Sequence, residues 1–152
     1  MKLVLQRVSR ASVSVGGEVK GAIGSGLMVL VGVDIDDAEE DARKLAAKTV
    51  ACRIFNDANG VMNLSVKDVE GEGLAVRQVT LLASTRKGNR PSYIRAAGHE
   101  LATHLYELYA SEVQRLLGKT VAKGVFGADM QVQLCNDGPF TVFLDSKELK
   151  LH

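Results

Sequence analysis

The sequence predicts a single α/β domain, residues 1–152, made mainly of antiparallel strands with two long helices. The main observation is that the hydrophobic period changes along the chain between two residues, typical of strands, and 3.6 residues, typical of helices. Glycine-containing turns also separate several of the strand-like segments. With 46% hydrophobic and 24% charged residues, the 152-residue chain has enough apolar side chains for one core and enough charge for a soluble surface. We find no internal repeat, linker or low-complexity segment.

The first half of the chain is predicted to contain strands followed by one helix. Residues 2–8 and 11–15 alternate with period two, and the Gly16-Gly17 pair predicts a tight hairpin turn into Glu18–Ile23. Leu27–Val33 is a continuous apolar run, which is typical of a strand buried on both faces. A helix over Asp37–Ile54 follows, because apolar residues repeat there at helical spacing after an N-cap offered by Asp34, Asp36 and Asp37.

The second half is predicted to contain one more long helix among short strands. The turn Gly71-Glu72-Gly73 precedes a strand over Leu74–Leu82. The helix opens after Pro91-Ser92 and ends at Gly118, with apolar residues at helical spacing from Ile94 onward. Three short strands follow, separated by turns at residues 127–129 and 136–139: Val121–Val125, Gln131–Cys135 and Thr141–Leu144.

Charge and hydropathy exclude several classes of protein. The 19 Lys and Arg nearly balance the 18 Asp and Glu, which argues against a protein that coats nucleic acid broadly. The longest uncharged apolar stretch, Gly21–Val33, is shorter than the roughly 20 residues that a membrane helix needs. The N-terminal residues lack the apolar region of a signal peptide, so we expect a cytoplasmic protein with no membrane association.

Cysteine and histidine give no sign of a metal site, and no nucleotide-binding motif indicates a cofactor. Cys52 and Cys135 have no CxxC spacing, and we interpret both as small buried hydrophobic residues. His99 and His104 are five residues apart, which places them on different faces of a helix, and His152 is the last residue. We therefore predict neither a bound metal nor a cofactor.

Two polar clusters stand out, although each has an ordinary structural interpretation. Gln78 and Thr80 fall on one face of the predicted strand, with Arg77 and Val79 on the other, as in any half-exposed strand. The segment Asn136–Pro139 reads equally well as a hairpin turn.

A basic segment precedes the second helix. RKGNRPSYIR, residues 86–95, carries four positive charges and no negative one, with Tyr93 among them. Such a pattern indicates phosphate binding through Arg86, Lys87, Arg90 and Tyr93, and it also fits a solvated loop.

Three segments of this sequence together resemble the D-aminoacyl-tRNA deacylase family. They are QRVSRASVSV with GEVKGAIGSGLMVLVGV, then RQVTLLASTRKGNRPSY, and finally FGADMQVQLCNDGPFTVFLDS, in the family's order and across nearly the whole chain. The resemblance implies a layered β/β/α fold, a homodimer, and hydrolysis of the ester that joins a D-amino acid to the 3′-terminal adenosine of a tRNA. Such an activity provides chiral proofreading in translation.

The resemblance also assigns residues. The family's catalytic motif, which begins with Ser-Gln, falls on RQVT at residues 77–80, which makes Gln78, Val79 and Thr80 the catalytic segment. The Gly-cisPro motif falls on Gly138-Pro139, which in the family enters the partner subunit's active site. Arg7 matches the arginine that braces the cis form of that pair, unlike in the related animal subfamily, whose Gly-Pro is trans.

This sequence departs from the family pattern at three positions. Arg77 replaces the usual serine, Val79 the usual phenylalanine, and Phe140 the usual valine.

An aminoacyl ester is already activated, so the predicted mechanism needs no dedicated nucleophile. Backbone N–H groups of residues 78–80 would stabilise the oxyanion, and the neighbouring ribose 2′-hydroxyl would orient water. Thr80 as a covalent nucleophile is the competing hypothesis, but no base stands beside it in the sequence.

Selection against L-amino acids would be steric, imposed by the backbone of Gly138-Pro139. Glycine lets the backbone approach closely, and an X-Pro bond adopts the cis form at a cost of only about 0.5–1 kcal/mol. Glycyl-tRNA, which has no side chain to reject, would also be hydrolysed.

Two other functions are also compatible with the sequence. One is a non-catalytic nucleic-acid-binding module, since eukaryotic relatives of the family have been linked to DNA unwinding elements. The other is a dimeric scaffold whose site has decayed through Arg77.

Overall fold

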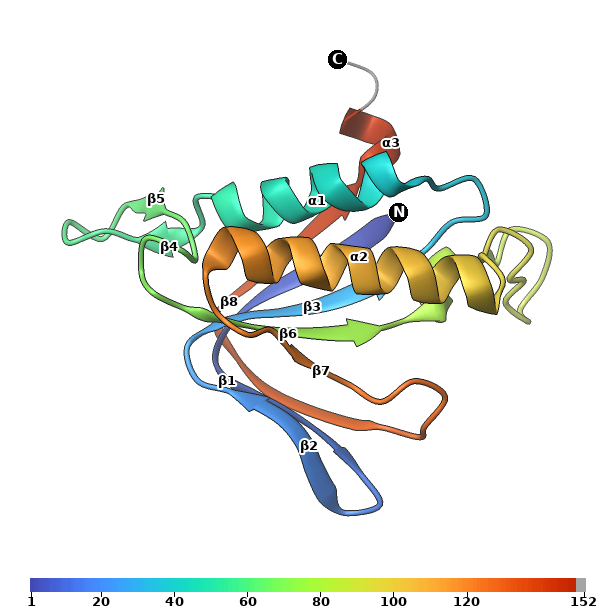
Figure 1. Ribbon diagram of the computed structural model, residues 1–152, viewed down its shortest axis with the longest axis horizontal. Helices are drawn as coiled ribbons and strands as arrows, with labels where there is room; N and C mark the ends of the chain where they lie inside the picture. The colour runs from blue at the N-terminus through green and yellow to red at the C-terminus, as the bar shows by residue number, and fades with distance from the viewer. Residues whose placement is uncertain (150–152) are drawn as a thin grey trace.

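Two long helices cover one face of a six-stranded sheet in the computed structural model, which describes residues 1–149 (Figure 1). The strands follow the order β2-β1-β3-β6-β7, and β8 also pairs with β1. The pairs β1–β2, β1–β3 and β1–β8 are antiparallel, while β3–β6 and β6–β7 are parallel. The predicted α/β fold with two long helices is confirmed.

The elements have the following bounds. The sheet strands are β1 (Lys2–Val15), β2 (Glu18–Ile23), β3 (Gly26–Gly32), β6 (Glu72–Arg77), β7 (Ala122–Lys123) and β8 (Gln131–Asp145), and a separate small hairpin contains β4 (Phe55–Asn56) and β5 (Met62–Leu64). The helices are α1 (Glu39–Ala51), the 3₁₀ turn η1 (Val79–Leu82), α2 (His99–Leu117) and the short α3 (Ser146–Leu149).

β1 is the centre of the sheet. It is one continuous strand, whereas the sequence predicted two, and its N-terminal half lies between β3 and β8. Its C-terminal half pairs with β2 through the predicted Gly16-Gly17 hairpin. Both glycines have positive φ values, 57° and 83°, which the two-residue hairpin turn requires.

The main core lies between the helices and the sheet. Leu3 and Leu5 of β1 pack there with Leu45 of α1 and Leu105 of α2, and all four are fully buried. β3 is buried on both faces, as predicted, because a smaller apolar cluster that includes Met28 covers its other side.

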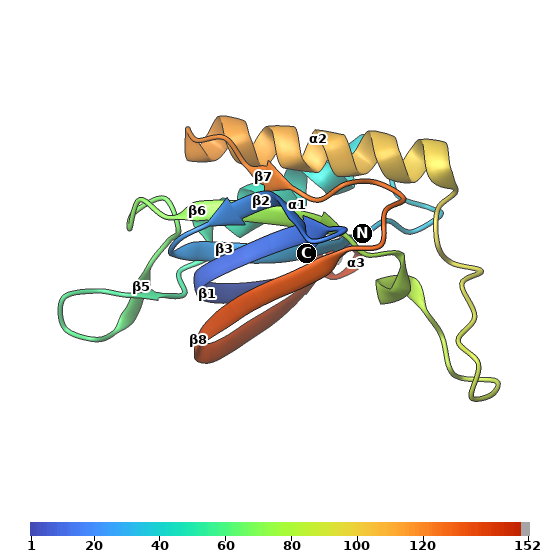
Figure 2. The same ribbon diagram turned by 90° about the horizontal axis from the view of Figure 1, so that it is seen from below.

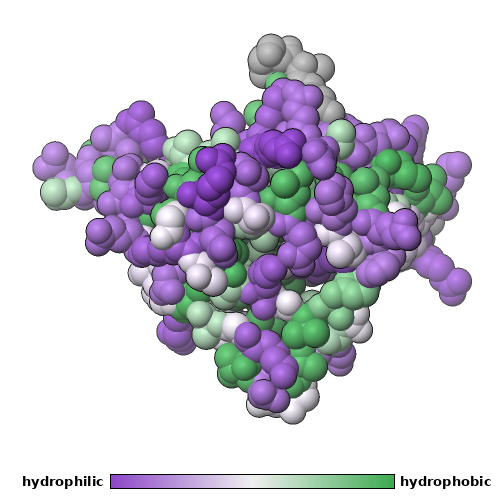
Figure 3. Space-filling model, viewed as in Figure 1, coloured by the Kyte–Doolittle hydropathy of each residue, from purple (hydrophilic) through white to green (hydrophobic). Residues whose placement is uncertain are grey.

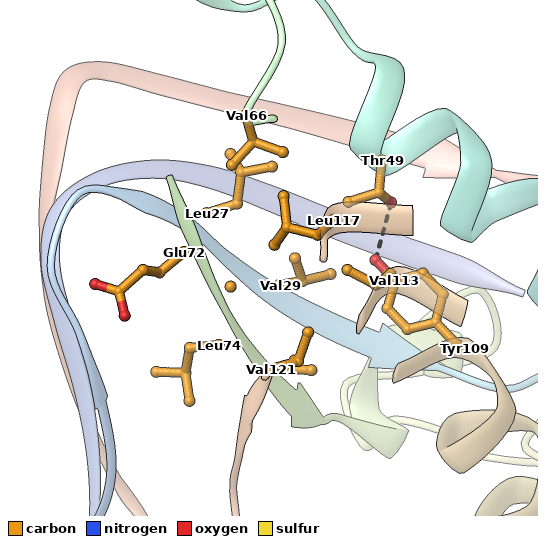
Figure 4. Close-up of a pocket in the computed structure, with 12 residues that line it drawn as sticks. Leu27, Val29, Thr49, Val66, Glu72, Leu74, Tyr109, Val113, Leu117 and Val121 are labelled. Atoms are coloured by element: carbon orange, nitrogen blue, oxygen red, sulfur yellow. Dashed lines mark hydrogen bonds between the residues drawn. The ribbon is translucent and has the colours of Figure 1, made fainter. Parts of the chain in front are cut away.

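Figure 4 shows the helix–sheet interface beneath α1 and α2. The buried Tyr109 hydroxyl finds its partner in Thr49 at 2.9 Å, which removes the cost of leaving a phenol unpaired in the core. Burial also raises the pKa of Tyr109 well above its usual value. The cavity here holds only about 10 Å³ and has an apolar lining, so it is a packing gap.

Both helices start later than the sequence predicted. Asp37 does not cap α1, because its carboxylate accepts a hydrogen bond from the buried Met1 ammonium at 2.5 Å; the N-cap is Ala38, whose N–H donates to Asp41. α1 also ends at Ala51 instead of Ile54.

α2 begins at His99. Residues 93–96 instead form a turn, in which the Ala96 N–H donates to the carbonyl of Tyr93 at 3.0 Å, and the Ala97 N–H then donates to the carbonyl of Val33 beside the end of β3, also at 3.0 Å. Ile94, expected on the apolar face of the helix, is 79% exposed. The predicted C-terminal stop at Gly118 is confirmed, with φ at 77°.

Several smaller expectations also need correction. The strand predicted over Val121–Val125 shortens to β7. Cys52 and Cys135 are half-buried instead of buried, and burial raises the pKa of the Cys52 thiol. His152 lies outside the described residues.

The surface is hydrophilic over the outer faces of the helices. Hydrophobic residues gather below them, over the β1–β2 hairpin and the connection from β7 to β8 (Figure 3). Within residues 1–149, no helix is both long and apolar enough to cross a membrane.

Candidate active site

The segment with Gln78 and Thr80 is a 3₁₀ turn, so the prediction of a strand over Leu74–Leu82 is wrong beyond Arg77. The Gln78 N–H donates the last hydrogen bond to the sheet, to the carbonyl of Val31, and η1 then turns away from the sheet. Gln78 and Thr80 were expected side by side on one strand face. They are in contact, but within the turn, where the Gln78 side-chain amide donates to the Thr80 hydroxyl.

Gly32 at the end of β3 makes room for this turn. A Cβ atom at Gly32 would lie 2.8 Å from the Leu81 side chain and 2.7 Å from that of Leu82. The turn therefore rests on the sheet through its last residues, and Val79 and Thr80 remain exposed. Because the first amides of a helical turn have no carbonyl partner within that turn, their N–H groups are the natural donors to a bound oxygen atom.

A pocket of about 440 Å³ opens beside η1, between the start of α2 and the loop that follows β7. Its lining includes Arg77, Val79, His99, Thr103 and Phe126. Arg77 and Val79, predicted to lie on the strand face opposite Gln78, thus face one cavity. The Arg77 guanidinium donates to the Thr103 hydroxyl at 2.8 Å and lies 4.3 Å from the centre of the Phe126 ring.

Two aromatic rings lie together at this pocket. The centroids of His99 and Phe126 are 4.4 Å apart, and the Thr103 hydroxyl is 3.3 Å from His99 Nδ1. Phe126 is nevertheless 59% exposed, so much of its ring remains available for contact with a ligand. Sequence reasoning did not single out His99, Thr103 or Phe126 as site residues; the only signal was Phe126 within the segment FGADM.

The segment containing Gly138-Pro139 is a bulge within β8, and the predicted hairpin turn is wrong. Gln6 pairs with Thr141 and Val8 with Asn136, so a single β1 residue, Arg7, faces four residues of β8, 137–140. Both halves of β8 are antiparallel to β1, which means that the chain does not reverse here. The Gly138-Pro139 peptide bond is cis, and Gly138 has a φ of 142°.

Arg7 holds this bulge from the β1 side. Its guanidinium donates to the carbonyls of Asp137, at 2.8 Å, and Ile54, at 2.6 Å, and lies 5.0 Å from the centre of the Phe140 ring. Asn136 closes the bulge from its other end, since its side chain accepts from the Phe140 N–H at 2.6 Å and donates to Thr141 at 3.1 Å. The sequence analysis did not assign a role to Asn136.

Within one chain, the bulge lies far from η1. β8 bends at its middle on the left of both ribbon views, whereas the chain that follows β6 is on the right (Figures 1 and 2). Gly138 and Pro139 are exposed, and the same strand exposes Val132 and Phe143, the latter by 54%.

The loop that contains the basic segment (the basic loop, residues 84–95) extends from the body of the molecule beside η1 (Figure 2). Ser84 and Ser92 join its two ends through a pair of backbone hydrogen bonds of 2.8 Å. Arg86, Lys87 and Arg90 are exposed, and Tyr93 is 44% exposed.

Arg95 differs from the other cations of this segment. It makes ion pairs with Asp34 at 2.6 Å and Asp36 at 2.5 Å. The buried Asp34 would have a raised pKa from burial alone, but hydrogen bonds from the Asp36 N–H, Lys147 and Arg95 outweigh burial and lower it. Arg95 therefore anchors the loop to the body.

Comparison with known proteins identifies the family to which this chain belongs. The model of the D-Tyr-tRNA(Tyr) deacylase family matches residues 4–145. The chain belongs to this family. Proteins named D-aminoacyl-tRNA deacylase from Akkermansia muciniphila and Porphyromonas gingivalis are 58% and 53% identical to it, and the alignments cover 97% and 96% of this chain and 99% and 97% of theirs.

Solved structures share the fold of this chain. The c-Myc DNA Unwinding Element Binding Protein superimposes with a TM-score of 0.91 at 39% identity, covering 95% of this chain and 98% of that one. A probable eukaryotic D-amino acid tRNA deacylase, with a TM-score of 0.81 and 19% identity over the same shares of the two chains, shares the deacylase fold. Among residues 1–149, no group of three or more His, Cys, Asp or Glu side chains is arranged to hold a metal ion.

Proposed function

We propose that this protein hydrolyses the ester bond of D-aminoacyl-tRNA as a homodimer in the cytoplasm, and that each active site combines η1 of one subunit with the Gly138-Pro139 bulge of the other. The observation that carries the proposal is the exposed, braced bulge, which lies on the opposite side of the chain from η1. Only a second copy can bring the two together. The exposed Val132 and Phe143 on β8 supply apolar surface for that contact.

The pocket beside η1 suits the 3′-terminal adenosine. It has a suitable volume, about 440 Å³, and Phe126 offers an exposed aromatic face on which a base can stack. The basic loop would then contact the phosphates of the acceptor end through Arg86, Lys87 and Arg90.

Hydrolysis would proceed without a covalent intermediate. The first N–H groups of η1, from Val79 and Thr80, would stabilise the negative charge that develops on the ester carbonyl oxygen. Water, oriented by the ribose 2′-hydroxyl, adds to the carbonyl carbon; the bond to the ribose 3′-oxygen breaks, and that oxygen takes up a proton.

Thr80 is poorly suited to act as the nucleophile. Its hydroxyl accepts a hydrogen bond from the Gln78 amide, and an amide cannot take up the hydroxyl proton. Gln78 is better placed to fix the orientation of this side chain.

Selection for the D-configuration would be steric. The rigid backbone of Gly138-Pro139, held by Arg7 and Asn136, would occupy the space that an L-side chain requires. Glycine has no side chain to collide with this backbone, so glycyl-tRNA would be hydrolysed as well.

The test compares deacylation of D-tyrosyl-, L-tyrosyl- and glycyl-tRNA by the purified protein, together with its molecular mass in solution. We expect a dimer that releases D-tyrosine and glycine and leaves the L-ester nearly intact, also after treatment with a chelator. A monomer with full activity would contradict the shared site. Binding of nucleic acid without turnover would favour a non-catalytic binding module, as the name of one structural relative suggests for that relative.

A further inference from the structure

Arg77 is a cation without a carboxylate partner. Within residues 1–149, no Asp or Glu oxygen lies within 4 Å of its guanidinium, whereas Arg95 and Arg115 both make ion pairs. Glu107, a carboxylate in the pocket lining, is instead paired with Lys123 at 2.7 Å.

The guanidinium of Arg77 is nevertheless held in place. It stacks on Phe126 and donates one hydrogen bond, to Thr103. Its remaining N–H groups have no acceptor among the hydrogen bonds of the described residues. Partial burial lowers the pKa of Arg77 because the charge has lost some hydration, and the more distant charge of Glu107, which makes no ion pair with it, offsets this only in part.

An unpaired, oriented guanidinium beside an exposed aromatic ring is a combination suited to a nucleotide. The ring can stack on the base, and the planar fork of N–H donors matches the oxygens of a phosphate group. We propose that Arg77 binds the phosphate on the 5′ side of the substrate's terminal adenosine while the base stacks on Phe126. This inference rests on the proposed function of the pocket.

The phosphate is favoured over an acidic amino-acid side chain because every tRNA carries it. A charge fixed in the pocket would otherwise serve only aspartyl and glutamyl esters. At this position the family pattern has a serine, which can donate one hydrogen bond but supplies no charge, so the contact would be a feature of this chain.

The decisive measurement is calorimetric binding of adenosine 5′-monophosphate and of adenosine to the wild-type protein and to Arg77→Ser. We expect the wild type to bind the monophosphate roughly tenfold more tightly than adenosine, and Arg77→Ser to bind the two alike. Arg77→Lys keeps the charge but loses the planar pair of N–H donors, so its preference for the monophosphate should lie between those of the wild type and Arg77→Ser. Arg115→Ser, on the same helix as Thr103 but outside the pocket, is the matched control and should behave as the wild type.

Turnover of D-tyrosyl-tRNA by the same variants distinguishes a failure of the role proposed for Arg77 from a failure of the proposed function. Arg77→Ser should raise KM with little change in kcat, because a phosphate contact is made equally in the ground and transition states. Equal loss of affinity for both nucleoside ligands would mean that Arg77 only supports the Phe126 wall, and no preference for the monophosphate in the wild type would equally overturn the inference. An effect of Arg77→Ser confined to D-aspartyl-tRNA would assign the charge to an amino-acid carboxylate and also overturn it. Failure of the wild type to hydrolyse D-tyrosyl-tRNA at all would instead contradict the proposed function.

Discussion

Replacing Gly138 by alanine should slow deacylation more than it disturbs the fold. A Cβ atom at this position would lie 2.9 Å from Arg7 Nη2, 3.0 Å from the Phe140 nitrogen and 3.2 Å from Phe140 Cβ. Arg7 cannot simply move away, because the same guanidinium already donates to the carbonyls of Asp137 and Ile54.

The φ of 142° at Gly138 adds a second cost in stability, because residues other than glycine rarely adopt this backbone conformation. A residue forced into such a backbone region costs about 1–3 kcal/mol. We therefore expect a folded dimer in which the free energy of unfolding falls by about that amount and the bulge moves by a fraction of an ångström or more. Misplacement of a site by about 1 Å can cost roughly a hundredfold in rate.

The assay is single-turnover deacylation of D-tyrosyl- and glycyl-tRNA, with urea unfolding measured in parallel. Both rates should fall by roughly ten- to a hundredfold, because the methyl group displaces the bulge whichever ester is bound. Gly16→Ala is the matched control: its φ is also positive, at 57°, but its Cβ would meet no atom within 4 Å. It should lose stability and keep its rates. Unchanged rates in a folded Gly138→Ala dimer would refute a role for the bulge in the active site.

Two further predictions concern the surroundings of the site. Replacing Arg86, Lys87 and Arg90 by alanine should raise the tRNA concentration needed for half-maximal rate and reduce the salt dependence of binding, because fewer counterions are released; an unchanged salt slope would assign these residues to a plain solvated loop. Asp34→Asn should lower the Tm at pH 7, because its ion pairs with Arg95 and Lys147 anchor the basic loop and the short helix α3. The pKa of Asp34 is lowered by folding, so its carboxylate stabilises the protein above pH 4 and loses this effect as the pH falls through the folded-state pKa; the Tm difference between Asp34→Asn and wild type should therefore shrink toward pH 3, and a constant difference would contradict this assignment.

Local features of the chain could be predicted from the sequence because their causes are local. The apolar run of β3, the Gly16-Gly17 hairpin and the end of α2 at Gly118 follow from hydrophobic period and from the backbone freedom of glycine. The motif resemblance similarly indicated the family, which the comparisons confirm. The charge pattern of the basic loop was also visible, although not that Arg95 is neutralised by Asp34 and Asp36.

The tertiary structure alone decided how the candidate site is built. Gln78–Thr80 reads as strand in sequence, but the chain leaves the sheet there because Gly32 on a neighbouring strand gives η1 a place to pack. Asn136–Pro139 reads as a turn, but both flanking segments pair with β1, whose Arg7 lies 130 positions before Asp137. The contact of Arg77 with Thr103 and Phe126 joins β6, α2 and the loop after β7, three segments that have no sequence signal in common. Side-chain and strand pairing between distant segments determines these conformations, and a hydrophobic period read along the chain contains no information about such partners. Only the motif resemblance indicated one of them, the contact of Arg7 with the Gly138-Pro139 segment.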